Sequence, residues 1–306
     1  TVSGGPMYYL SKAFKEKGHA KTGKILAVGF AIMTIFAAFG AGNMFQGNQA
    51  NAMIVQTFGL APGYGWITGI IFAILLAGVI IGGMPSIGSV TSKLVPFMAT
   101  LYVGMAVIVL VSHYDQIGAA FEQIFIGAFT GAGVAGGFIG ALIQGLKRAT
   151  FSNEAGVGSA AIAHSAVKTK EPITEGFVSL LEPFIDTVVI CTMTALVIII
   201  SGMNTGALSG VTLTAAAFTE TSFIFEYFLA LAVVMFAFST MVSWSYYGLK
   251  AWTYLFGEVA TTELVYKWIF CLFVIVGTSI SFGAVIDFSV AAMFSMSIFN
   301  IIWLYY

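Results

Sequence analysis

Apolar residues occur along this chain in long, nearly unbroken runs that are separated by shorter, more polar stretches. Eight of these runs have about 20 residues, the length of an α-helix that crosses the hydrocarbon core of a bilayer. They comprise residues 24–48, 64–84, 94–112, 129–146, 176–201, 222–249, 262–282 and 284–306. The run from Val188 to Ile200 does not alternate apolar and polar residues, as a strand of a membrane barrel would. The pattern therefore predicts an all-α polytopic membrane protein with about eight transmembrane helices.

The composition agrees with a protein that is surrounded by lipid. Charged residues make up 8% of the 306 residues and hydrophobic residues 59%, whereas soluble domains have roughly 25% charged residues. The net charge of −1 says nothing about partners, but the sequence has no basic stripe that would suit nucleic acid. Cys191 and Cys271 lie in apolar runs without metal-ligand spacing, so we interpret them as packing residues.

All 12 cationic side chains fall on one side of the predicted topology. They are Lys12, Lys15, Lys17, Lys21, Lys24, Lys93, Lys147, Arg148, Lys168, Lys170, Lys250 and Lys267. The opposite connections, at 48–63, 113–128 and 202–221, contain none. Because cytoplasmic loops are enriched in Lys and Arg, the lysine-rich N-terminal loop is predicted to be cytoplasmic. We expect a multi-pass protein of the plasma membrane, such as a bacterial or archaeal inner membrane.

The two ends of the chain favour further helices beyond them. The first residues, TVSGGPMYYL, resemble a loop from the middle of a protein, and the last residues, IIWLYY, stop within an apolar run. We therefore expect the natural protein to have further helices at both ends.

Polar groups inside a membrane are costly unless they are paired or face water, so they mark candidate functional sites. The first cluster is GAGNMFQGNQ at residues 40–49. Its glycines permit close backbone approach, and Asn43 and Gln46, three residues apart, can share one helix face. These amides either face a substrate or cross-link packed helices.

The second cluster, TFSNEAGVGSAAIAH at residues 150–164, predicts a break in a helix. Such a break survives at membrane depth only where it is buried or lines a cavity, and transporters bind ligands at such helix ends. The alternative is a cytoplasmic loop, because Lys147 and Arg148 precede it. At the membrane midplane these cations would need a partner such as Glu154. We interpret His164 as a paired helix histidine rather than a proton relay.

The third cluster is EPFIDT at residues 182–187. Pro183 is predicted to kink its helix and to free a carbonyl group. Glu182 and Asp186 are four residues apart and would repel each other if both were ionised, so they need a cation or a shared proton. The alternative is that this segment lies near the cytoplasmic surface.

The fourth cluster, FAFSTMVSWSYY at residues 236–247, places several hydroxyl groups and a tryptophan in one short stretch. Such hydroxyls often bond a carbonyl of the preceding helical turn. Alternatively, Ser239 and Thr240 ligate a small hard cation, which takes oxygen donors.

Motifs for bond-breaking chemistry are not found in the sequence. It contains no HExxH, CxxC or phosphate-binding glycine loop and no Ser-His-Asp constellation. Only Glu182 with Asp186 approaches an acid–base pair, and amides and hydroxyls suit binding and release. We therefore predict that the protein is not an enzyme.

At these clusters the sequence resembles the alanine or glycine:cation symporters, which are sodium-coupled carriers of small neutral amino acids. The resemblance runs nearly from end to end and rests on five stretches in the same order. They are GGPMYY at 4–9, GAGNMFQ at 40–46, FSNEAGVGSAAIAH at 151–164, PFIDTVVICTMTAL at 183–196 and FAFSTMVSWSYYG at 236–248.

The resemblance implies a leucine-transporter-like fold, in which two inverted five-helix repeats contain broken first and sixth helices. The segment at 24–48 would be core helix three. Residues 1–306 would then form a single, partial transmembrane domain with core helices three to ten. The segment at 129–146 and the second cluster would form core helix six, broken near residues 151–158.

The family's pattern also suggests the functional residues. Gln46, Asn153 and Trp244 would contact the substrate, with Asn43 as a further candidate. The hydroxyls of Ser239 and Thr240 would bind sodium, the coupling ion; no other cofactor is expected.

The function implied is the sodium-coupled symport of alanine or glycine into the cell by alternating access. The expected partners are a small neutral amino acid, sodium and membrane lipid. Two alternatives stay open. One is a proton-coupled carrier of the same fold, with Asp186, Glu182 or Glu154 as the proton site, and the other is an ion channel.

Overall fold

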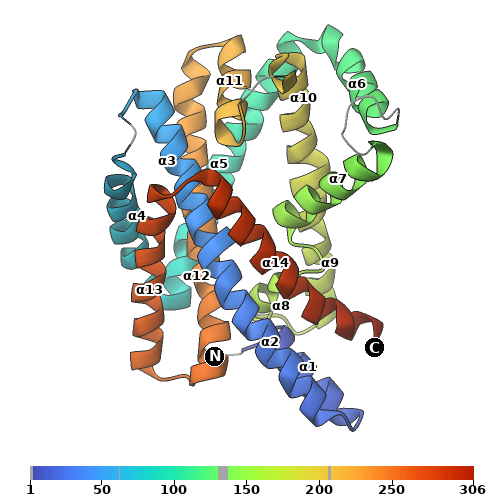
Figure 1. Cartoon of the computed structure of the whole chain (residues 1–306), viewed down its shortest axis with the longest axis vertical. Helices are drawn as coiled ribbons and strands as arrows, with labels where there is room; N and C mark the ends of the chain where they lie inside the picture. The colour runs from blue at the N-terminus through green and yellow to red at the C-terminus, as the bar shows by residue number, and fades with distance from the viewer. Residues whose placement is uncertain (1–2, 62, 130–136, 206–207) are drawn as a thin grey trace.

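The computed structural model describes residues 3–61, 63–129, 137–205 and 208–306, and every regular element within these ranges is helical (Figure 1). The α-helices are α1 (Pro6–Glu16), α2 (Ala20–Phe39), α3 (Phe45–Phe58), α4 (Gly65–Ile80), α5 (Gly83–Ser112), α6 (Ile117–Phe129), α7 (Gly137–Asn153), α8 (Ser159–His164), α9 (Pro172–Pro183), α10 (Thr192–Ile200), α11 (Val211–Thr221), α12 (Ile224–Phe256), α13 (Ala260–Ser279) and α14 (Phe282–Tyr305). Two π-helical segments, η1 (Gly40–Met44) and η3 (Phe184–Cys191), and two 3₁₀ turns, η2 (Tyr114–Gln116) and η4 (Met203–Thr205), connect them. The predicted all-α class is confirmed.

Six helical runs in the described part of the chain are long and apolar enough to cross a membrane. They are Ala20–Phe58, Gly83–Ser112, Pro172–Ile200, Ile224–Phe256, Ala260–Ser279 and Phe282–Tyr305. The multi-pass class is therefore confirmed.

Two of the eight predicted spans fall on shorter helices. The segment at 64–84 becomes α4, whose 16 residues are about 24 Å long. The segment at 129–146 passes through residues 130–136, which lie outside the described residues, and continues as the 17-residue α7. The count of eight and the leucine-transporter-like arrangement stay predictions.

The outer faces of the helices are apolar, as expected for surfaces that contact lipid. Ile74, Val111 and Phe177 are 67%, 66% and 67% exposed. Inside the bundle small side chains predominate along α2, where Ala27 and Ala31 are fully buried. Small residues let helix backbones approach closely, which is how helices pack inside membranes.

Two long elements form the centre of the bundle (Figure 1). The run from α2 through η1 to α3 has 39 residues, and α12, which has 33, packs against α2, α3, α5 and α13. The last helix, α14, packs against α2 and η1. Because η1 is surrounded by α12, α13 and α14, the irregular part of the first run lies deep in the protein.

The helices are interrupted where the sequence predicts irregular backbone. The chain turns between Asn153, the last residue of α7, and Ser159, the first residue of α8, which confirms the predicted break in the helix. After Pro183 the expected kink takes the form of the π-helical segment η3. Such π segments change the register of backbone hydrogen bonds and often occur at functional sites.

Candidate functional site

A cavity of about 460 Å³ lies where η1 and α3, the end of α7, α9, α12 and α14 meet. Its volume is within the range of about 300–1,000 Å³ that is common for small-molecule sites. Helix α12 contributes much of the wall, and Phe45 and Phe151 contribute aromatic surface. The polar side chains of the lining are Gln46, Ser152, Glu154, Glu182, Ser239, Thr240, Ser243, Trp244 and Tyr247.

The α12 wall follows from helical periodicity. Thr240, Ser243, Trp244 and Tyr247 are spaced so that they share one helix face, and all four line the cavity. Ser239 also lines it, but its hydroxyl donates to the Phe236 carbonyl at 3.1 Å, which is the local bond expected of a helical serine. Within the described residues the Thr240 hydroxyl has no hydrogen-bond partner, so it is available to a ligand or an ion.

The break between α7 and α8 places a carboxylate in this cavity. Glu154 has φ 56°, the one positive φ of a non-glycine residue in the described ranges. Its carboxylate accepts hydrogen bonds from the Ser159 hydroxyl and, at 2.9 Å, from Trp244 Nε1. Residues in the left-handed region are strained and persist only where their surroundings hold them, often at functional sites. The Glu154–Trp244 bond therefore ties the break to α12.

The rest of the turn is fixed by glycine and by a chain of polar contacts. Gly158 has φ +103°, and a Cβ there would lie 2.8 Å from Pro6 and 2.9 Å from Phe30, so a glycine is needed. The Gly156 carbonyl accepts a hydrogen bond from Asn300 Nδ2 at 2.8 Å. Asn300 in turn accepts one from the Tyr9 hydroxyl, so α1 and α14 both hold the turn.

A close approach between η1 and α12 sets the position of the tryptophan. A Cβ added to Gly42 would lie 2.3 Å from both Cβ and Cγ of Trp244. Trp244 itself is only 2% exposed. The indole is thus confined by the glycine on one side and by the carboxylate of Glu154 at its ring nitrogen.

Four of the six predicted site residues line the same cavity: Gln46, Ser239, Thr240 and Trp244. They come from α3 and α12, nearly 200 residues apart, so the fold brings together what the sequence separates. Gln46 donates to the Ala41 carbonyl at 3.0 Å, which leaves its side-chain oxygen for other partners. Their roles in binding substrate or sodium stay predictions.

The other two predicted residues do not line this cavity. Asn43 is fully buried and donates to the Phe270 carbonyl at 2.6 Å, so it cross-links η1 to α13. Asn153 donates to the Thr187 hydroxyl at 2.7 Å and accepts from the Ala155 amide at 2.9 Å. The Asn43 contact is a cross-link between packed helices, which is the alternative to substrate binding. Asn153 connects the helix break to η3.

The acidic pair of the third cluster has separate partners. Asp186 accepts a hydrogen bond from the Ser152 hydroxyl at 2.6 Å, whereas Glu182 lies 3.8 Å from His164 Nε2. Each carboxylate thus has its own partner among the described residues, and a shared proton or cation stays a prediction. His164 Nδ1 also lies 2.5 Å from Glu175, in agreement with a paired histidine.

The cations before the break do not pair with Glu154. In the part of the chain that the structure describes, neither Lys147 nor Arg148 has a carboxylate within 4.0 Å, because Glu154 bonds Trp244 and Ser159 instead. Within the same residues no group of three His, Cys, Asp or Glu side chains could hold a metal ion. The oxygen-bearing side chains of the lining are hydroxyls, the Gln46 amide and the carboxylates of Glu154 and Glu182.

Sequence reasoning missed several lining residues, among them Ser243, Tyr247 and Phe151. Ser243 and Tyr247 could have been found by extending the helical face from Trp244 and Thr240. Phe151 lies immediately before the break and contacts Phe45 edge to face, with 5.3 Å between ring centroids. That contact joins residues 106 positions apart, and no local pattern indicates it.

Comparison with known proteins identifies relatives that match this chain over most or all of its length. The family model described as the sodium:alanine symporter family matches residues 1–306. The sodium/alanine symporter AgcS of Methanococcus maripaludis is 43% identical over 261 residues, which are 84% of this chain and 56% of AgcS. The uncharacterized transporter YflA of Bacillus subtilis is 35% identical over 90% of this chain and 58% of its own length. The amino-acid carrier protein AlsT of the same organism is 32% identical over 80% of the chain and 51% of its own length.

The chain thus spans a little more than half the length of the first two relatives. The family match covers the break, the η1 glycines and the hydroxyl face of α12, the three features that build the cavity. On these grounds, this chain belongs to the sodium:alanine symporter family.

Proposed function

We propose that the protein carries a small neutral amino acid, alanine or glycine, into the cell together with sodium, and that the 460 Å³ cavity is part of the substrate site. The observation that supports this most directly is the Glu154–Trp244 hydrogen bond, which fixes a helix break against a hydroxyl-bearing helix. Broken helices supply free backbone groups for the charged ends of an amino acid.

The lining combines polar groups with aromatic surface. Phe45, Phe151, Trp244 and Tyr247 contribute the aromatic side chains. Gln46 offers an amide to the ammonium or carboxylate group of the amino acid. A relative that is 43% identical carries the name sodium/alanine symporter, in line with this substrate class.

Coupling follows from linkage between two sites on the same helix. Thr240 and Ser239 would supply hydroxyl ligands to sodium, while Trp244, one helical turn along, would contact the amino acid. If sodium favours the arrangement of α12 that binds substrate, substrate must favour sodium binding by the same factor. Alternating access would then move both solutes together.

A proton-coupled carrier is the second candidate, because Glu154 and Glu182 both line the cavity. A carboxylate that takes up a proton with the substrate could replace sodium as the coupling site. The structure of the lining is compatible with either ion, so the distinction requires a transport measurement.

The deciding measurement is radiolabelled alanine uptake into proteoliposomes that contain the full-length protein. We expect accumulation with an inward sodium gradient, none with a matched potassium gradient, and competition by unlabelled glycine or serine. Uptake driven by a pH gradient without sodium would support the proton-coupled alternative. If neither gradient drives uptake, the proposed substrate class is overturned.

Thr240→Ala is expected to raise the sodium concentration for half-maximal uptake by roughly tenfold, with little effect at saturating sodium. One oxygen ligand of the ion would be lost, and tenfold corresponds to about 1.4 kcal/mol. Ser239→Ala should act in the same direction but less strongly, because its hydroxyl already bonds the Phe236 carbonyl.

The matched control for these variants is Ser245→Ala, which removes a buried hydroxyl from α12 outside this cavity. Its sodium dependence should equal that of the wild type. A Thr240→Ala protein with an unchanged sodium curve would remove Thr240 from the ion site.

A further inference from the structure

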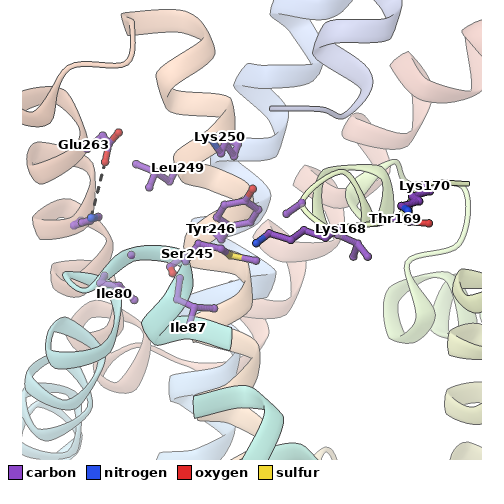
Figure 2. A pocket seen from close by; sticks show the side chains of 15 residues that line it. Ile80, Ile87, Lys168, Thr169, Lys170, Ser245, Tyr246, Leu249, Lys250 and Glu263 are labelled. Carbon is purple, nitrogen blue, oxygen red and sulfur yellow. Dashed lines mark ion pairs between the residues drawn. The ribbon is translucent and has the colours of Figure 1, made fainter. Parts of the chain in front are cut away.

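A second, larger cavity, of about 840 Å³, lies on a different face of α12 from the candidate site (Figure 2). Its walls come from the turn between α4 and α5, the segment that follows α8, the second half of α12 and the start of α13. On α12 it is lined by Ser245, Tyr246, Leu249 and Lys250, whereas the candidate site is lined by Ser243, Trp244 and Tyr247. The proposed transport function makes no use of this cavity.

Four lysines but only one carboxylate line this cavity. The lysines are Lys168, Lys170, Lys250 and Lys267, and the carboxylate is Glu263. Lys267 lies 4.0 Å from Glu263, and Lys250 lies 3.9 Å from Glu258, which stands outside the lining. Lys168 and Lys170 have no carboxylate within 4.0 Å among the residues that the structure describes. Two positive charges are therefore uncompensated, and Figure 2 shows the Lys168 amine directed across the cavity toward Tyr246.

The opposite wall of the cavity is apolar and continues into a crevice. The apolar wall is formed by Ile80, Ile87 and Leu249. A narrow crevice between α4 and α13 shares Ile80 and Lys267 with this cavity. Apart from Lys267 the crevice is lined by apolar side chains and Cys271. It reaches the outer surface, where Ile81 is 54% and Trp268 57% exposed. The charged cavity thus adjoins an exposed apolar surface of α4 and α13, and the crevice itself, of about 10 Å³, is too small for an acyl chain.

The level of the cavity matches the boundary of the membrane. Its walls include the ends of spanning helices: α5 begins at Gly83, α12 ends at Phe256 and α13 begins at Ala260. Its lysines come from two connections that the charge pattern predicts to be cytoplasmic. Anionic headgroups lie at this level, and basic pockets between helices on the cytoplasmic side bind them.

We propose that this cavity binds the phosphate-bearing headgroup of an anionic phospholipid, with an acyl chain lying on the exposed apolar surface of α4 and α13 beside it. Lys168 and Lys170 supply the charge, and the Tyr246 hydroxyl supplies a further hydrogen-bond donor. A free phosphate would satisfy the lysines but would leave the apolar wall and the neighbouring exposed apolar surface unused. Both parts of the cavity therefore favour a lipid, and the proposal does not depend on the transported substrate.

Native mass spectrometry of the full-length protein in detergent tests the proposal. The protein is titrated with phosphatidylglycerol or with phosphatidylcholine of the same chains. We expect phosphatidylglycerol to bind more tightly by about tenfold, because each lysine near an anionic lipid adds to the attraction. The double variant Lys168→Gln/Lys170→Gln should lose that preference. Lys12→Gln/Lys15→Gln, which changes two exposed lysines of α1 outside the cavity, should keep it.

The remaining outcomes overturn the proposal. Equal binding of the two lipids by the wild type would overturn it. So would a loss of the phosphatidylglycerol preference in Lys12→Gln/Lys15→Gln as large as that in Lys168→Gln/Lys170→Gln. Displacement of phosphatidylglycerol by millimolar inorganic phosphate would assign the cavity to a soluble anion. Since transport is not measured, a failure here is distinct from a failure of the symport proposal.

A second measurement places the acyl chain. Phosphatidylglycerol with brominated chains should quench tryptophan fluorescence more in the wild type than in Trp268→Phe, because Trp268 lines the crevice. The difference should fall in the Lys168→Gln/Lys170→Gln protein. Equal quenching in all three proteins would place the chain elsewhere.

Discussion

Gly42→Ala is expected to abolish amino-acid uptake and to lower the thermal stability of the protein. The new methyl group would lie 2.3 Å from Cβ and Cγ of Trp244, a distance that real side chains do not reach. Either the indole or the backbone of η1 must move, and such overpacking costs about 1–3 kcal/mol. Both movements disturb the cavity wall, so uptake and the unfolding temperature should fall together.

The control for this prediction is Gly104→Ala. Gly104 lies inside α5, and a Cβ there meets nothing within 4 Å. Because alanine is the better helix former, this variant should keep its uptake and its unfolding temperature. A Gly42→Ala protein with normal uptake would show that Trp244 does not need its present position for transport.

Glu154→Ala is the second variant with a large expected effect, a loss of uptake of about 100-fold or more. The substitution leaves Trp244 Nε1 and the Ser159 hydroxyl without their shared acceptor. An unpaired buried donor costs about 1–3 kcal/mol, so two such donors disfavour the present arrangement of Trp244 and the helix break, on which the proposed substrate site depends. Uptake of labelled alanine at saturating sodium measures the effect directly.

Two further variants separate the acceptor from the charge. Glu154→Gln keeps a side-chain oxygen for Trp244 and should retain a substantial part of sodium-driven uptake. Glu182→Gln alters the other carboxylate of the cavity, which pairs with His164, and should have a smaller effect than Glu154→Ala. If Glu154→Gln were as inactive as Glu154→Ala, the carboxylate itself would be required, as in the proton-coupled alternative.

The helices and their interruptions could be predicted from the sequence because they depend on local information. Runs of apolar residues specify spans, Gly156 and Gly158 specify a break, and Pro183 specifies an irregular helix. The predicted span at 64–84 is longer than α4 for a related reason. The apolar run at 64–84 contains Gly82 and Gly83, where α4 gives way to α5, and hydropathy alone does not reveal that turn.

The candidate site was predictable only in part because its contacts join distant segments. Trp244 and Glu154 are 90 residues apart in the chain, and no periodicity indicates that the indole nitrogen meets that carboxylate. Asn43 illustrates the converse. Its spacing from Gln46 suggested a shared role, but η1 changes the helical register between them, and Asn43 instead reaches the backbone of α13.

The contact between Asn300 and the Gly156 carbonyl has a consequence for the assembly of the protein in the cell. Its two partners are 144 residues apart, and Asn300 lies on the last described helix. During synthesis the turn at residues 154–158 therefore emerges from the ribosome long before the group that fastens it. Until α14 has been inserted beside α2, the carbonyl of Gly156 lacks this partner. Completion of the cavity is thus a late step of biogenesis that follows insertion of α14.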